Sequence, residues 1–193
     1  TVFPIPGKDS DSFQKSVIFF PAAGVLIAAV LYPVFLLCQN IPNDLSVLRG
    51  VGMVLFSTIC TGGLHLDGIA DTADGFLGGN SKESVLRILK DCANGTFGTS
   101  AIVFDLLIKT AIYQFLVGRS QYLPVIMMFF TSRLCQGMVI SLCSYARGPE
   151  GVANPFFGNK NGLIMLITQL TAVHVLLFLN TGISNYLYAL FGA

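Results

Sequence analysis

The sequence predicts an all-α fold: a polytopic integral membrane helical bundle with at least five transmembrane helices and its active site on the cytoplasmic side. Hydrophobic residues make up 53% of the chain and charged residues only 11%, whereas soluble domains carry roughly 25% charged residues. The mean hydropathy is +0.72. Five apolar runs are also close to the ~20 residues that a spanning helix needs. A length of 193 residues predicts a single domain over residues 1–193, and the composition predicts that it is embedded in a membrane.

The five runs define the expected helices in order. They cover about residues 17–37, 50–66, 101–118, 121–143 and 163–179. The second run leads directly into a helix that carries three aspartates. Because the chain begins with Thr1, we expect a short N-terminal piece to precede it.

The basic residues predict how the bundle is oriented. With the N-terminus in the cytoplasm, only Arg49 and Arg119 face outward, and this asymmetry is the positive-inside pattern. The expected cytoplasmic residues are Lys8, Lys15, Lys82, Arg87, Lys90, Arg147 and Lys160. The aspartate helix and both polar loops then lie on the cytoplasmic side.

The segment TGGLHLDGIADTADG (61–75) carries the chemistry most clearly. Asp67, Asp71 and Asp74 are spaced i, i+4 and i+7, so they share one helix face. No Lys or Arg occurs between Arg49 and Lys82 to neutralise them. A divalent cation such as Mg²⁺ or Mn²⁺ suits such an oxygen-rich face. The alternative is a set of solvated carboxylates favoured by the helix dipole.

A second short helix is predicted to follow at SKESVLRILKD (81–91), with Ser81 at its start, and to bring a fourth acid, Asp91, back toward the aspartates. Its Lys82, Arg87 and Lys90 suit either substrate phosphates or anionic lipid headgroups.

The neighbouring His65 is either a hydrogen-bonded structural residue or a catalytic base. Glycines beside the acids allow close backbone approach, and we expect Gly75 and Gly95 to contact substrate. Helix packing is the alternative role for glycines in a membrane protein.

Charged side chains also lie inside the predicted spans. Asp105 and Lys109 have the i, i+4 spacing of an intrahelical ion pair. Arg133 has no acidic partner at that spacing, so it pairs elsewhere, binds phosphate or extends to the interface. Arg147, in the second polar loop, suits phosphate recognition or a topological anchor.

Other features exclude some functions. The net charge is +1 without a basic run, so we expect no nucleic-acid partner. The five cysteines lack CxxC spacing, which argues against a zinc site.

Together these segments resemble the cobalamin-5′-phosphate synthase (adenosylcobinamide-GDP ribazoletransferase) family. The resemblance rests on FFPAAG (19–24), TGGLHLDGIADTADGF (61–76), KDCANGTFG (90–98), SR (132–133) and YARGPEGVANPFFGN (145–159). It implies a multi-pass enzyme of the prokaryotic cytoplasmic (inner) membrane that completes cobamide assembly. Family members join adenosylcobinamide-GDP to α-ribazole or α-ribazole 5′-phosphate, release GMP and use Mg²⁺.

The resemblance also bears on site residues and on chain length. It places Asp67, Asp71, Asp74 and Asp91 at acidic motif positions, which we expect to be both metal ligands and catalytic residues, with His65 beside them. The expected substrate-binding residues are Arg133, Arg147, Lys82, Lys90, Gly75 and Gly95. A further GGxTGDxxGA-like segment of the family has no match here, so we expect a C-terminal part to be missing. A homo-oligomer is left open.

Two other functions also fit parts of the sequence. DTADG (71–75) matches the start of a CDP-alcohol phosphotransferase motif, but the rest of that motif is absent. A proton- or cation-coupled transporter would explain the intramembrane charges, although the acids concentrate at one edge.

Overall fold

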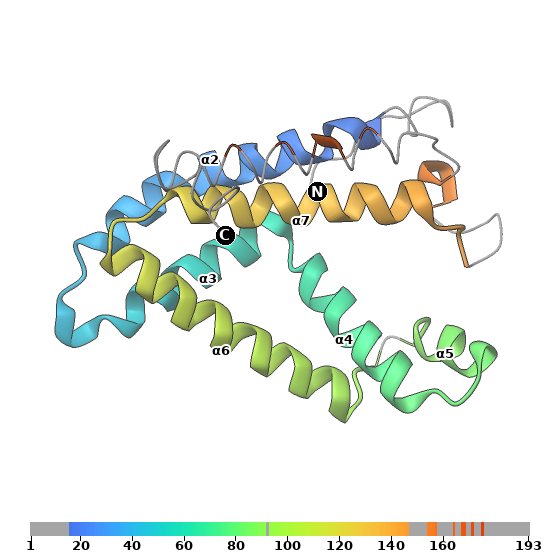
Figure 1. The fold of residues 1–193 in the computed structure, drawn as a ribbon. Helices are drawn as coiled ribbons and strands as arrows, with labels where there is room; N and C mark the ends of the chain where they lie inside the picture. Colours follow the sequence, from blue (N-terminus) through green and yellow to red (C-terminus); the bar gives the residue numbers. More distant parts are fainter. Residues whose placement is uncertain are drawn as a thin grey trace, which may run out of the picture. The chain divides into compact units, whose positions relative to one another are not determined.

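The computed structural model describes residues 16–91, 93–146 and 154–157, with isolated positions between 164 and 175. All regular secondary structure in these residues is helical, as predicted (Figure 1). The α-helices are α2 (Phe20–Gln39), α3 (Val47–Thr61), α4 (Leu64–Gly78), α5 (Lys82–Ile88), α6 (Thr96–Gly118) and α7 (Leu123–Leu142). Short 3₁₀ turns cover Val17–Phe19, Asn43–Leu45 and Asn154–Phe156.

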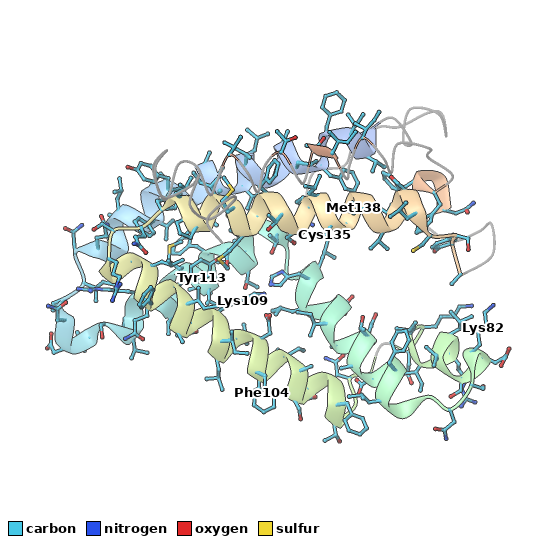
Figure 2. All side chains as sticks on the ribbon, viewed as in Figure 1. Lys82, Phe104, Lys109, Tyr113, Cys135 and Met138 are labelled. Carbon is cyan, nitrogen blue, oxygen red and sulfur yellow. The ribbon has the colours of Figure 1, made fainter. Side chains whose placement is uncertain are left out.

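Three helical segments are long and apolar enough to cross a membrane. They are Val17–Gln39, Thr96–Gly118 and Leu123–Leu142, and they confirm the first, third and fourth predicted spans. The predicted span at 163–179 lies almost entirely outside the described residues. Large apolar side chains of these helices are exposed, among them Phe104, which points away from α3 and α4 in Figure 2. Such a surface suits lipid.

The second predicted span differs from the structure. We expected one helix over 50–66 that continues directly into the aspartate helix. Instead α3 ends at Thr61, α4 begins at Leu64, and the two helices are bent by 91°. The cause is local, because Gly62 and Gly63 both have left-handed backbone angles, with φ of 65° and 69°. If this pair counts as one broken span, the described residues hold up to four spans.

The chain divides into two compact units. The first takes in Val25–Phe129, and its core is formed by α2, α3 and α6 with the start of α7. The fully buried side chains at its centre are Leu31, Phe35, Met53, Tyr113, Val117 and Val125. In the second unit, Val17 and Leu134 are buried among Phe20, Phe130, Met138, Ile140 and Phe156.

Within the first unit, α6 contacts α3 toward one end and α4 toward the other. Near the α6 C-terminus, Gln114 donates to Ser46 Oγ (3.1 Å), just before α3 begins. Gly50 lies so close to α6 that a Cβ there would be 2.1 Å from the Thr110 carbonyl oxygen. Small residues that admit a neighbouring backbone are typical of packed membrane helices.

The intrahelical ion pair predicted in α6 is confirmed. Lys109 Nζ lies 2.6 Å from Asp105 Oδ2. The pair keeps both charges satisfied within an apolar span.

Candidate functional site

The candidate site is formed where the end of α4, the short helix α5 and the beginning of α6 meet (Figure 1). The α5 helix starts as predicted, because Ser81 Oγ accepts a hydrogen bond from the Ser84 amide at 3.2 Å. Its apolar side packs on glycines of α4. A Cβ at Gly75 would lie 3.2 Å from Leu89, and one at Gly79 would lie 2.6 Å from Val85. The predicted return of this segment toward the aspartate helix is confirmed.

Asp74 joins α4 to the N-terminus of α6. Its Oδ2 accepts the Gly95 N–H at 2.7 Å and its Oδ1 accepts the Gly98 N–H at 2.8 Å. Asp74 is only 9% exposed. A carboxylate bound by two amides at a helix N-terminus is favoured by charge-assisted hydrogen bonds and by the helix dipole. We call this arrangement the α4–α6 contact.

An open cleft of about 430 Å³ lies beside this contact. Asp91 lines it and is exposed, and its Oδ1 accepts the Ala93 N–H at 3.1 Å in an Asx turn. The lining residues are Asp74, Gly78, Ile88, Asp91, Ala93, Asn94, Gly95, Thr96 and Phe97. The structure therefore brings two of the four predicted acids, Asp74 and Asp91, to one cleft.

The other two acids lie earlier on α4. Asp67 is exposed and Asp71 is half-buried, and helical periodicity puts both on the same face as Asp74. At Gly68, between them, an added Cβ would meet nothing within 4 Å. Asp67 is about 10 Å along the helix axis from Asp74 at 1.5 Å per residue. The acidic face thus has an exposed carboxylate at Asp67, a half-buried one at Asp71, and one at Asp74 that is bound to the start of α6.

A metal cage made by the protein alone is not assembled. Among the described residues, no three His, Cys, Asp or Glu side chains are grouped closely enough to hold a metal ion. The carboxylates of this face still fit Mg²⁺, because this ion commonly takes one or two protein carboxylates and completes its shell with substrate phosphates and water.

His65 is placed away from the acids. Its Nδ1 lies 3.1 Å from Thr61 Oγ1, and at about 100° per residue it is rotated roughly 200° from Asp67 around α4. That hydrogen bond fits the structural alternative considered for this residue.

The basic residues of α5, and Lys90 just after its C-terminal end, are directed to solvent. Lys82, Arg87 and Lys90 are all exposed, and Figure 2 shows Lys82 projecting from α5 at this end of the first unit. The ion pair between Lys109 and Asp105 lies far from α5 in sequence.

The remaining predicted residues fall elsewhere. Arg133 belongs to the second unit, where it donates to Gln136 Oε1 at 2.9 Å on the same helix. Arg147 lies outside the described residues. Gly75 and Gly95, expected to contact substrate, approach the chain's own Leu89 and Asp74, although Gly95 also lines the cleft.

Sequence reasoning missed the polar and aromatic residues of the cleft, Asn94, Thr96 and Phe97, and the binding of Asp74 to α6. The available signal was the Gly-x-x-Gly spacing at Gly95 and Gly98, immediately before a long apolar helix.

Comparison with known proteins agrees with these features. The whole chain, residues 1–193, matches the cobalamin-5-phosphate synthase family. An adenosylcobinamide-GDP ribazoletransferase of Prosthecochloris aestuarii is 34% identical over 176 residues, covering 91% of this chain and 70% of that protein. A protein of the same name from Chlorobaculum tepidum is 33% identical over 195 residues, covering 100% of this chain and 76% of that protein. No solved structure matches. The chain belongs to the cobalamin-5-phosphate synthase family.

Proposed function

We propose that this chain is an adenosylcobinamide-GDP ribazoletransferase whose reaction takes place along the acidic face of α4 and the adjoining cleft. The family match over residues 1–193 and the names of the relatives support this activity, the final step of cobamide assembly. The substrates are adenosylcobinamide-GDP and α-ribazole or its 5′-phosphate, and the reaction releases GMP. The observation that carries the site is a row of carboxylates on one face of α4, with Asp67 exposed and Asp74 lining the adjoining cleft.

Asp67 and Asp71 are the proposed ligands for Mg²⁺. The two side chains lie one helical turn apart on one face of α4, Asp67 is exposed, and Gly68 leaves room for a large substrate to approach the backbone. When bound, Mg²⁺ would neutralise charge on the pyrophosphate of the GDP moiety.

The remaining steps need an acceptor for one proton. The ribazole 3′-hydroxyl attacks the phosphorus next to cobinamide, a new O–P bond forms, and the bond to the departing GMP breaks. We assign the hydroxyl proton to Asp91, which lines the cleft and uses only Oδ1 in its Asx turn. Such a base contributes about 10²- to 10⁴-fold in rate. His65 is a poorer base because it lies on another side of α4 and its Nδ1 is near Thr61.

The α5 cations are proposed to attract the anionic substrate. Lys82 and Arg87 are exposed on α5, and Lys90 is exposed just after the C-terminal end of that helix. Arginine and lysine at this position suit phosphate oxygens.

We also propose that the site faces the cytoplasm from the inner membrane. Arg49 and Arg119 lie at the C-terminal end of α6, where a Cβ at Gly118 would be 3.5 Å from the Arg49 guanidinium. Lys82, Arg87 and Lys90 lie near the opposite end of this 23-residue helix. That asymmetry supports a cytoplasmic α5 under the positive-inside rule.

The test is release of GMP by purified protein in lipid vesicles. We expect GMP formation that requires added α-ribazole, stops with EDTA and returns with Mg²⁺. Asp67→Asn and Asp71→Asn should each lower kcat/KM by at least about 100-fold, as expected for loss of a metal ligand. Asp44→Asn, in an exposed turn near the other end of α6, is the matched control and should retain activity.

Two results would contradict the proposal. Near-normal activity in both Asn variants at limiting Mg²⁺ would place the metal elsewhere. Solute flux into vesicles without GMP formation would favour a transporter.

A further inference from the structure

We propose that Asp74 is a positioning residue: its carboxylate fastens the N-terminus of α6 to α4, sets the width of the cleft and is not a ligand of the metal. The hydrogen bonds of the α4–α6 contact are present in the structure and do not depend on the proposed function. The kinetic effects expected from their loss do rest on it.

The contact distinguishes Asp74 from the other acids on its face. Each of its two oxygens accepts a backbone N–H, from Gly95 at 2.7 Å and from Gly98 at 2.8 Å. The residue is 9% exposed. Asp67 is exposed on the same helix. A side chain held between two amides and largely shielded from water is poorly placed to bind an incoming cation.

The two glycines are shaped for this carboxylate. All three of the nearest atoms to a Cβ at Gly95 belong to Asp74, the closest being Oδ1 at 2.5 Å. A Cβ at Gly98 would lie 2.2 Å from Asp74 Oδ2 and 2.9 Å from the Ala70 carbonyl. Gly95 has φ of −80°, a value that any residue adopts. Its lack of a side chain is therefore explained by the space that Asp74 occupies.

The contact sets the cleft because its partners are cleft walls. Gly78 belongs to α4 and Ile88 to α5, whereas Gly95, Thr96 and Phe97 belong to the beginning of α6. Two hydrogen bonds that span 21 and 24 residues of sequence hold these walls together. Loss of the carboxylate frees the start of α6 and widens the cleft.

A double-mutant cycle tests the contact without using activity. In the otherwise unchanged protein, Gly95→Ala should lower the unfolding temperature by about 5 °C, since ~2 °C or more is lost per kcal/mol in a chain of this size. With Asp74→Ala already present, the same change should lower it by about 1 °C or less, because the clashing atoms are gone. Equal effects in the two backgrounds would overturn the proposal. If Asp74→Ala does not accumulate in membranes, Asp74→Ser provides the same cycle with a short polar side chain.

Kinetics of Asp74→Asn test the positioning role. An amide offers one acceptor oxygen where the site needs two, so one α6 N–H would face an NH₂ group. We expect KM for adenosylcobinamide-GDP to rise about tenfold, as 1.4 kcal/mol of lost binding would produce. The Mg²⁺ concentration for half-maximal rate should stay within twofold of the unchanged protein.

Asp67→Asn is the comparison variant, and its Mg²⁺ requirement should rise at least tenfold. A rise of that size in Asp74→Asn would make Asp74 a metal ligand and refute the inference. If both variants leave the Mg²⁺ requirement unchanged while the stability cycle shows coupling, the metal assignment fails and the α4–α6 contact stands.

Discussion

The bend between α3 and α4 depends on two glycines, and their replacement offers a stringent test of the fold. Gly62 has φ 65° and ψ 19°, and Gly63 has φ 69° and ψ 0°. These angles let the Gly62 N–H reach the Ile59 carbonyl at 3.1 Å and the Gly63 N–H reach that of Thr58 at 3.0 Å. The left-handed conformation costs an L-residue with a Cβ about 1–2 kcal/mol.

The size of the effect at Gly63 follows from the space around it. A Cβ at Gly63 would meet only the Thr58 methyl, at 3.9 Å, so steric overlap adds nothing and the backbone conformation sets the cost. We expect Gly63→Ala to lower the free energy of unfolding by about 1–2 kcal/mol. Adding Gly62→Ala should bring the loss to about 2–4 kcal/mol, or very roughly 5–15 °C in unfolding temperature.

Gly68 is the matched control because it lies in the interior of α4 with nothing within 4 Å of an added Cβ. Gly68→Ala should stabilise the protein by roughly 0.5–1 kcal/mol, since alanine is the better helix residue. Thermal unfolding followed by circular dichroism, in one detergent and at one protein concentration, compares the variants directly. The left-handed bend would be refuted if Gly63→Ala and Gly68→Ala changed the free energy of unfolding in the same direction. It would also be refuted if the Gly63→Ala protein were as stable as the original.

Two further substitutions probe the packing of α6. Gly50→Ala places a Cβ 2.1 Å from the Thr110 carbonyl oxygen, and because that atom is backbone, we expect a loss of about 1–3 kcal/mol or failure to accumulate in membranes. Thermal unfolding or membrane yield measures it, and a neutral result would contradict the close α3–α6 crossing. Lys109→Met leaves the Asp105 carboxylate without its partner at 2.6 Å and should cost about 3 kcal/mol within the span. The double variant with Asp105→Leu should recover most of that loss, whereas no recovery would show that the pair is not the stabilising unit.

Local features of this molecule could be read from the sequence because they depend on neighbouring residues. Apolar runs predicted α2, α6 and α7 to within a few residues of their observed bounds. The Asp105–Lys109 pair follows from a spacing of one helical turn, and the Ser81 cap from a side chain that reaches an amide three residues on. Helical periodicity likewise placed three aspartates on one face before any tertiary contact was known.

Only the tertiary structure showed that the three aspartates have different surroundings. Nothing in the spacing of Asp67, Asp71 and Asp74 indicates that the third meets amides 21 and 24 residues away, because helical periodicity fixes direction around an axis but not which helix packs there. The 91° bend at Gly62 and Gly63 was equally hidden, since glycine tolerates both a continuous helix and a left-handed turn. The sequence therefore determined that a row of carboxylates lies at the edge of a membrane bundle. Packing of α4 against α6 decided that Asp74 is bound by the chain's own amides while Asp67 stays exposed, because periodicity alone does not determine which helix packs on a face.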